Sequence, residues 1–93
     1  MKIDYTHDAI EDLVQLREFI AAKDPAAAER YARSLREGIG RLVDQPHLGH
    51  PVHYAPEPEN IRDLVVGNYI ARYALLDDRI IILRIWHQRE NWK

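Results

Sequence analysis

Three runs rich in Ile, Val, Leu and aromatic residues fill the last third of the chain, and two short turn signals separate them. The turn signals are Gly67-Asn68 and Asp77-Asp78, which suit two-residue hairpins because positive φ costs least for Gly, Asn and Asp. The pattern predicts a three-stranded antiparallel meander within residues 62–93. The rest of the chain must supply what covers this sheet.

A two-residue turn at Asp77-Asp78 also predicts the register of the last two strands. In that register the pairs on one face are Leu75 with Ile80, Tyr73 with Ile82, Ala71 with Arg84 and Tyr69 with Trp86. The other face carries Ile70, Arg72, Ala74, Leu76, Ile81, Leu83, Ile85 and His87. Both faces are largely apolar, so both need cover. A pair of helices can cover only one face, and the other is filled by loops and termini or offered to a partner.

The first half of the chain predicts a short strand and two helices. Residues 2–5 form the strand, and Thr6 then caps a helix that runs to about Ala22. Asp24 and Pro25 are a second helix start, since proline suits the first helical position. The expected buried stripes are Ala9, Leu13, Leu16 and Ile20, widened by Ile10 and Phe19, in the first helix, and Ala28, Tyr31, Leu35, Ile39 and Leu42 in the second. The short link between the helices implies an antiparallel hairpin.

A loop follows the helices, because the prolines and Gly49 between residues 46 and 58 disfavour regular structure. A chain of 93 residues supports one hydrophobic core, so residues 1–93 are expected to form a single domain. The predicted fold class is α+β, with an N-terminal strand, an antiparallel helical hairpin and a three-stranded antiparallel meander.

Composition and charge narrow the class of function. The net charge of −2 argues against direct binding of RNA or DNA, whose phosphates favour proteins with a strong basic excess. The absence of cysteine removes disulfide and thiol chemistry and fits a reducing compartment. The chain shows neither a secretory signal nor an apolar run long enough to span a bilayer, so we expect a cytoplasmic protein without membrane contact.

Few residues suggest a metal or cofactor site. His47, His50 and His53 recur every three residues, but they lie in a loop rich in Pro and Gly and no Cys accompanies them. A solvated loop is therefore favoured over a metal site. The glycines match no nucleotide-binding fingerprint, and Ser34, the single serine, lies inside a predicted helix. We expect no metal and no cofactor.

The remaining group of chemically capable residues gathers at the C-terminal end: Arg84, Trp86, His87, Arg89, Glu90 and Trp92. In one interpretation His87 and Arg89 act on a phosphodiester, His87 as acid or base and Arg89 on the developing charge. In the other, Trp86 is a core residue, Arg84 is a paired strand residue and the tail is an exposed recognition edge. We favour the second interpretation because no second base is apparent.

The order of strand, helical hairpin, proline-rich loop and meander resembles the RelE/ParE superfamily of type II toxin–antitoxin toxins, over nearly the whole chain. The segments that carry the resemblance are Asp24-Pro25-Ala26-Ala27-Ala28, Gln45-Pro46-His47-Leu48-Gly49-His50-Pro51-Val52, Arg62-Asp63-Leu64-Val65-Val66-Gly67-Asn68-Tyr69 and Ile82-Leu83-Arg84-Ile85-Trp86-His87. Their order along the chain makes the resemblance specific.

The resemblance implies one of two activities. RelE-like toxins are ribosome-dependent mRNA endonucleases, whereas ParE-like toxins inhibit DNA gyrase and are not known as nucleases. The nuclease branch has an arginine directly after the tyrosine that opens the middle strand, where this chain has Ile70. Arg89 could match the second arginine of that branch, but its later catalytic tyrosine has no counterpart among the 93 residues. The ParE-like branch therefore fits better.

The resemblance also implies partners. Toxins of this kind are held inactive by a cognate antitoxin, which lies along the helices and the sheet edge in a hetero-oligomer. We therefore expect a toxin without catalytic residues that contacts DNA gyrase through Arg84, His87, Arg89 and Trp92. The alternatives are a ribosome-dependent endonuclease with His87 and Arg89 in catalytic roles, and a non-toxic binding module.

Overall fold

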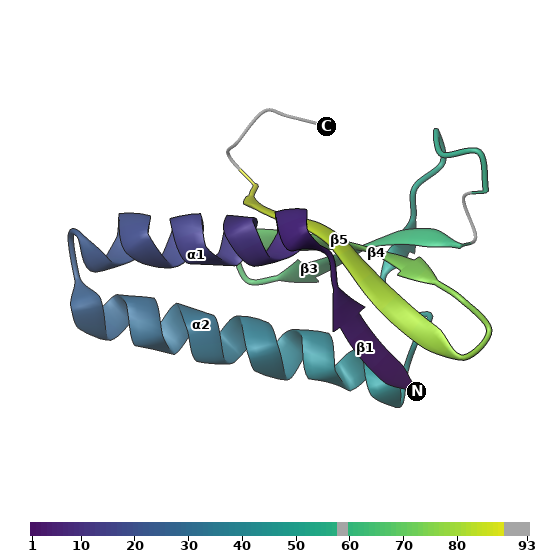
Figure 1. Cartoon of the computed structure of the whole chain (residues 1–93), viewed down its shortest axis with the longest axis horizontal. Coiled ribbons are helices and arrows are strands. Elements are labelled where there is room, and N and C mark those ends of the chain that lie inside the picture. Colours follow the sequence, from purple (N-terminus) through teal and green to yellow (C-terminus); the bar gives the residue numbers. More distant parts are fainter. Residues whose placement is uncertain (58–59, 89–93) are drawn as a thin grey trace.

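Five strands form one sheet in the order β1-β5-β4-β3-β2, and two helices pack against one of its faces (Figure 1). The computed structural model describes residues 1–57 and 60–88. The elements are β1 (Lys2–Tyr5), α1 (His7–Ala21), α2 (Pro25–Gly40), the 3-10 turn η1 (Arg41–Val43), β2 (His50–Pro51), β3 (Ile61–Val66), β4 (Tyr69–Leu75) and β5 (Arg79–His87). The α+β class and the order of the predicted elements are confirmed.

The predicted meander is present as β3, β4 and β5, but two further strands extend it to a five-stranded sheet. β1 pairs in parallel with β5, so that Tyr5 lies opposite Ile82. β2 pairs antiparallel with β3 at the other edge. The prediction of an irregular segment over residues 46–58 is therefore wrong at His50–Pro51. A proline is tolerated there because an edge strand has one side that needs no backbone donor.

Both two-residue hairpins form, but only one of them uses the positive φ on which the prediction was based. Gly67 has φ of +59°, and it occupies the first central position of its turn, where glycine is favoured. No residue other than glycine has positive φ among the described residues, so Asn68, Asp77 and Asp78 turn the chain without it. The Leu76 N–H donates to the Arg79 carbonyl at 2.9 Å and closes the second turn.

A β-bulge changes the register of β5 halfway along the strand. Leu75 lies opposite Ile80 and Tyr73 opposite Ile82 as predicted, and the register then shifts between Arg72 and Tyr73. A one-residue shift exchanges the two faces of a strand. The predicted pairs of Ala71 with Arg84 and of Tyr69 with Trp86 are therefore wrong. The structure pairs Ala71 with Ile85, Ile70 with Trp86 and Tyr69 with His87.

The two helices begin where the caps predicted them. The Thr6 hydroxyl accepts the Ala9 N–H at 3.0 Å, and an Asp24 carboxylate oxygen accepts the Ala27 N–H at 3.2 Å. The buried stripes are narrower than expected, since Ile10 and Phe19 are 49% and 65% exposed. Tyr31 is also exposed, at 41%, so the prediction that these three side chains are buried is wrong.

The hydrophobic core lies between the helices and the face of the sheet that they cover. Its sheet residues come from three strands and its helical residues from both helices and η1. The buried cluster consists of Ala9, Leu35, Ile39, Leu42, Leu64, Tyr69, Ala71, Tyr73, Leu75, Ile80, Ile82 and Ile85. We call the opposite face of the sheet, which carries Asp63, Arg72 and Trp86, the outer face.

Candidate functional site

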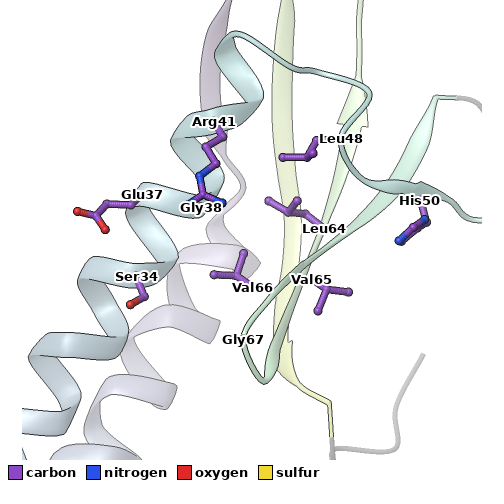
Figure 2. A pocket seen from close by; sticks show the side chains of 10 residues that line it. All are labelled: Ser34, Glu37, Gly38, Arg41, Leu48, His50, Leu64, Val65, Val66 and Gly67. Carbon is purple, nitrogen blue, oxygen red and sulfur yellow. The ribbon is translucent and has the colours of Figure 1, made fainter.

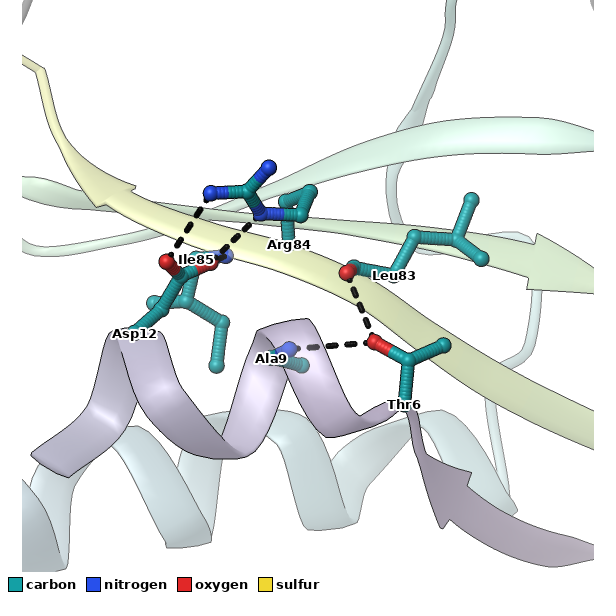
Figure 3. Close-up of polar contacts among 6 residues, drawn as sticks. All are labelled: Thr6, Ala9, Asp12, Leu83, Arg84 and Ile85. Carbon is teal, nitrogen blue, oxygen red and sulfur yellow. Dashed lines mark hydrogen bonds and ion pairs between the residues drawn. The ribbon is translucent and has the colours of Figure 1, made fainter.

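The C-terminal half of β5 carries the two described members of the predicted target-binding set. Arg84 forms a two-point ion pair with Asp12 of α1, with its Nε 2.9 Å from Oδ2 and its Nη2 3.1 Å from Oδ1 (Figure 3). The Asp12 side chain is only 11% exposed. The hydrogen bond to Asp12 raises the pKa of Arg84, while burial acts in the opposite direction. Arg84 is therefore a permanently charged group held on α1.

Beyond Ile82, where the pairing with β1 ends, α1 lies along the edge of β5 that faces away from β4. The Thr6 N–H donates to the Ile82 carbonyl at 3.0 Å, and the Thr6 hydroxyl donates to the Leu83 carbonyl at 2.8 Å. Further along, the Ile85 N–H donates to Asp12 Oδ2 at 2.9 Å, beside the ion pair with Arg84 (Figure 3). Thr6, the N-cap of α1, and the Asp12 side chain of α1 thus satisfy a strand edge that β1 leaves open beyond Ile82.

His87 lies on the helix-covered side of the sheet rather than beside Arg84. Its ring meets the ring of Tyr69 edge-on, with centroids 5.2 Å apart. Tyr69 in turn meets Tyr31 of α2 with centroids 5.7 Å apart. The bulge therefore separates Arg84 and His87, which the sequence placed in one constellation. Arg89, Glu90 and Trp92 lie outside the described residues.

The outer face carries a cluster that the sequence analysis did not identify. Arg72 binds Asp63 at two points, Nε to Oδ1 at 2.8 Å and Nη2 to Oδ2 at 2.9 Å. Its Nη2 also donates to the Tyr54 hydroxyl at 2.6 Å. The guanidinium carbon lies 5.4 Å from the centroid of the Tyr54 ring and 5.1 Å from that of Trp86. The hydrogen bond with Asp63 is the main cause that raises the pKa of Arg72.

This cluster was predictable in part. Counting outward from the turn at Gly67-Asn68 places Asp63 directly opposite Arg72, which is a favourable cross-strand pair. Trp86 is buried, at 6% exposure, but it lies on the outer face with Arg72. The interpretation of Trp86 as a core residue is therefore confirmed by its burial, although the bulge turns it to the face away from the helices.

A second polar cluster fixes the loop before β2. The buried Arg62 donates from Nη1 to the Gly49 carbonyl at 2.8 Å. The Tyr73 hydroxyl accepts the Gly49 N–H at 2.9 Å and donates to the Pro46 carbonyl at 2.7 Å. Burial raises the pKa of Tyr73, and the Gly49 hydrogen bond and the charge of Arg62 partly oppose it. These contacts are structural, since they hold backbone groups of the chain itself.

The described residues also line hollows on the surface. One, of about 420 Å³, lies between α2 and β3 and is lined by Ser34, Glu37, Gly38, Arg41, Leu48, His50 and residues 64–67 (Figure 2). Another, of about 200 Å³, is a mainly apolar groove between α1 and α2 whose walls include Leu13, Leu16, Ile20, Tyr31 and Leu35. Residues 1–57 and 60–88 contain no group of three or more His, Cys, Asp or Glu side chains suited to hold a metal ion. Within these residues no helix has the length and apolar character needed to span a membrane.

Comparison with known proteins places these features in a family. A family model described as the ParE toxin of the type II toxin–antitoxin system parDE matches residues 3–92. Toxin RelE2 of Caulobacter vibrioides is 31% identical over 87 residues, which cover 92% of this chain and 93% of that protein. Toxin RelE1 of the same organism is 31% identical over 85 residues, which cover 89% and 88%.

Solved structures share the fold. A chain of the chromosomal ParDE system from P. aeruginosa superposes with a TM-score of 0.78 at 23% identity, covering 94% of this chain and 95% of its own. A chain of the E. coli DinJ-YafQ complex superposes with a TM-score of 0.68 at 19% identity, covering 99% and 98%. The family match extends over the helical hairpin and all five strands. The protein is therefore a toxin of the ParE family of type II toxin–antitoxin systems, within the RelE/ParE superfamily.

Proposed function

We propose that the protein inhibits DNA gyrase by direct protein–protein contact and that a cognate antitoxin neutralises it in a hetero-oligomeric complex. The observation that carries the proposal is the state of three arginines of the meander. Arg62 is bound to loop carbonyls, Arg72 to Asp63 and Arg84 to Asp12. A ribonuclease of this fold needs arginines that can meet a phosphate in the transition state. These three are already engaged by the protein itself.

The charge of the chain supports the same choice. A net charge of −2 supplies little of the counterion release on which binding to nucleic acid depends. The ion pairs with Asp12 and Asp63 further neutralise the positive charge of the meander. Contact with a protein surface requires no such excess.

The proposed target-facing residues are Arg84, His87, Arg89 and Trp92. Arg84 keeps 41% of its side chain exposed while it is bound to Asp12, so it can offer one side of the guanidinium to a partner. His87 is half-buried against Tyr69, which fixes the plane of its ring. Both lie on the last described strand, directly before Arg89 and Trp92 in the sequence.

The antitoxin is proposed to cover apolar surface of the helices. Ile10 and Val14 are 49% and 50% exposed, one turn apart on α1, beside the apolar groove between α1 and α2. Exposed apolar surface of this kind is typical of an interaction site. The neighbours of the fold support a partner, since two of them are described as a ParDE system and a DinJ-YafQ complex.

The decisive experiment is a gyrase supercoiling and cleavage-complex assay with purified, antitoxin-free protein. We expect supercoiling to stop and cleaved DNA to accumulate in proportion to the protein added. Lys23→Ala, at the exposed link between the helices, is a control that should inhibit as well as the wild type. If the folded protein leaves gyrase unaffected, the proposal is wrong for the gyrase tested.

The names of the relatives favour a second candidate, a ribosome-dependent mRNA endonuclease of the RelE type, because two of them are called RelE toxins. That function predicts that His87→Ala and Arg89→Ala each abolish RNA cleavage on the ribosome. The position of His87 against Tyr69, across the sheet from Arg72, weighs against it. A non-toxic binding module is the third candidate, and normal growth of cells that express the chain alone would identify it.

A further inference from the structure

We propose that Asp12 is a positioning residue: it clamps the bulged half of β5 to α1 and so sets how Arg84 and His87 are presented to the target. The part that concerns the target rests on the proposed function. Asp12 itself lies on α1 and is 11% exposed, so its action on a target runs through the strand it holds. Nothing in the sequence of α1 marks this aspartate among the other acidic residues of the helix.

Asp12 accepts three hydrogen bonds from two consecutive residues. Two come from the Arg84 guanidinium at 2.9 and 3.1 Å, and one from the Ile85 N–H at 2.9 Å. A carboxylate has acceptor sites for all three, whereas an amide has fewer and would turn donors toward a guanidinium. A carboxylate therefore satisfies all three donors, and an amide cannot.

These contacts influence where the following side chains point, because they lie beside the bulge in β5. Thr6, the N-cap of α1, binds the carbonyls of Ile82 and Leu83, and Asp12 binds the next two residues (Figure 3 shows the contacts to Leu83 and Arg84), so the start of α1 holds the strand on both sides of the bulge. A bulge bends the strand and re-aims the side chains that follow it. β1 pairs with β5 only as far as Ile82, and the strand beyond that point has α1 as its outer neighbour.

The inner side of the same segment remains paired with β4. Tyr69 lies opposite His87, and the Gln88 N–H donates to the Asn68 carbonyl at 2.8 Å. Removal of Asp12 therefore leaves the strand in the sheet, and Ile85 keeps its place in the core. Only the hydrogen bonds at the edge facing α1 are lost, so Arg84 is released from α1 and the end of β5 can twist. Folding and presentation of the strand can thus be measured separately.

The test compares Asp12→Ala and Asp12→Asn with Glu11→Ala. Glu11 is the adjacent acid on α1, it is half-exposed, and it pairs with His7 at 3.1 Å. Its loss removes an equal charge near Arg84 but none of the hydrogen bonds from Asp12 to β5. Three quantities are measured for each variant: the exchange rate of the Ile85 amide by NMR, the concentration that inhibits gyrase, and growth arrest of cells that express the chain alone. Thermal melts establish the temperature at which every variant is fully folded.

We expect Asp12→Ala to speed exchange at Ile85 and to raise the inhibitory concentration about tenfold, the size of effect that loss of one charged, partly buried contact produces. Asp12→Asn should fall between Asp12→Ala and the wild type, because it can still accept from the Ile85 N–H. Glu11→Ala should match the wild type in all three measurements. In the Asp12→Ala background, Arg84→Ala should cost less than it does alone, since the two residues act as one unit.

Two results would overturn the inference. One is unchanged exchange at Ile85 in Asp12→Ala, which would mean that the clamp does not hold the strand. The other is faster exchange with undiminished growth arrest, which would mean that presentation of β5 does not matter to the target. Growth arrest without gyrase inhibition in the wild type refutes the proposed target alone, because the clamp is then judged by exchange and growth.

Discussion

Tyr73 shows how one buried hydroxyl ties a loop to the sheet. It is fully buried, and its hydroxyl makes one hydrogen bond as acceptor and one as donor to backbone groups of the loop before β2. Buried backbone groups that lose their partners cost free energy, because water does not replace the lost contact. The segment from Pro46 to Gly49 therefore depends on a residue far from it in the sequence.

Tyr73→Phe should lower the free energy of unfolding by about 1–3 kcal/mol, since it leaves the Gly49 N–H and the Pro46 carbonyl without partners. Urea unfolding followed by far-UV circular dichroism measures the change. Tyr31→Phe, at a side chain that is 41% exposed, is the control and should change it by less than about 0.5 kcal/mol. Equal effects of the two substitutions would contradict the assigned role of the hydroxyl.

Gly49 and Gly40 differ in the space available for a side chain, so alanine at each should have the opposite effect on stability. A Cβ at Gly49 would lie 2.7 Å from the Tyr73 ring and 2.8 Å from its hydroxyl, whereas nothing lies within 4 Å of a Cβ at Gly40. Gly49→Ala should therefore destabilise the protein by about 1–3 kcal/mol through overpacking. Gly40→Ala, at a φ of −59°, should stabilise it by about 0.4–1 kcal/mol. Thermal melts of both variants check the opposite signs.

The raised pKa of Tyr73 predicts how stability changes in alkaline solution. Burial favours the neutral phenol in the folded chain, so the folded pKa lies above the ordinary value of 10.0. The contribution of this group is complete below about pH 10, and it is lost as the pH rises through the folded pKa. Unfolding measured at a series of pH values above 10 should show a shallower loss for Tyr73→Phe than for the wild type. Parallel curves would refute this assignment.

At the scale of elements, the cross-strand pair of Arg72 and Asp63 joins β4 to β3 on the outer face. Their side chains are 16% and 24% exposed, and Tyr54 and Trp86 flank the guanidinium. A partly buried, two-point ion pair has a larger coupling energy than an exposed one, because solvent screens it less.

A double-mutant cycle of Arg72→Ala and Asp63→Ala should give a coupling of about 1–3 kcal/mol. The same cycle for Arg17 and Glu29, which link α1 to α2 with both side chains more than half exposed, should give less than about 1 kcal/mol. Urea unfolding of the single and double variants supplies both values. A larger coupling for the exposed pair would contradict the argument from burial.

The elements themselves were largely predictable, because their signals are local. The caps at Thr6 and Asp24 and the turn at Gly67-Asn68 are short motifs whose effect does not depend on the rest of the fold. The bulge in β5 was not predictable from the strand alone. It places Ile85 in the core and brings Arg84 to Asp12, and both partners lie on segments distant in sequence.

At the scale of the whole molecule, the sequence did not predict that β1 pairs with β5 or which residues of β5 lie on each face of the sheet. Both depend on contacts between segments that are distant in the sequence. A parallel pair between the two ends of the chain leaves no local mark, because it needs no turn. The separation of Arg84 from His87 follows from the bulge, so the arrangement of these two candidate residues could not be predicted from the sequence. The exposure of Ile10 and Phe19 on α1 was not predicted, because the stripe that the sheet and α2 cover is narrower than the stripe of apolar residues in the sequence.

The surface of α1 supplies a prediction about assembly. Val14→Asp should weaken binding of the cognate antitoxin about tenfold or more, because it places a charge in apolar contact surface at a side chain that is 50% exposed. The stability of the free toxin should hardly change, since the side chain is not in the core cluster. Titration calorimetry with the purified antitoxin measures the affinity, and Lys23→Ala is again the control. Unchanged affinity would remove this face of α1 from the interface.

The place of β5 in the sheet also bears on biosynthesis. It is the last of the described strands to leave the ribosome, yet it lies between β1 and β4 and contributes Ile80, Ile82 and Ile85 to the core. A nascent chain that stops before β5 lacks these three core residues, and its β1 has no strand to pair with until β5 has been made. The strand proposed to face the target is also the one that completes the fold. A chain that stops before Arg79 therefore lacks both the strand that joins β1 to the sheet and the residues proposed to meet the target.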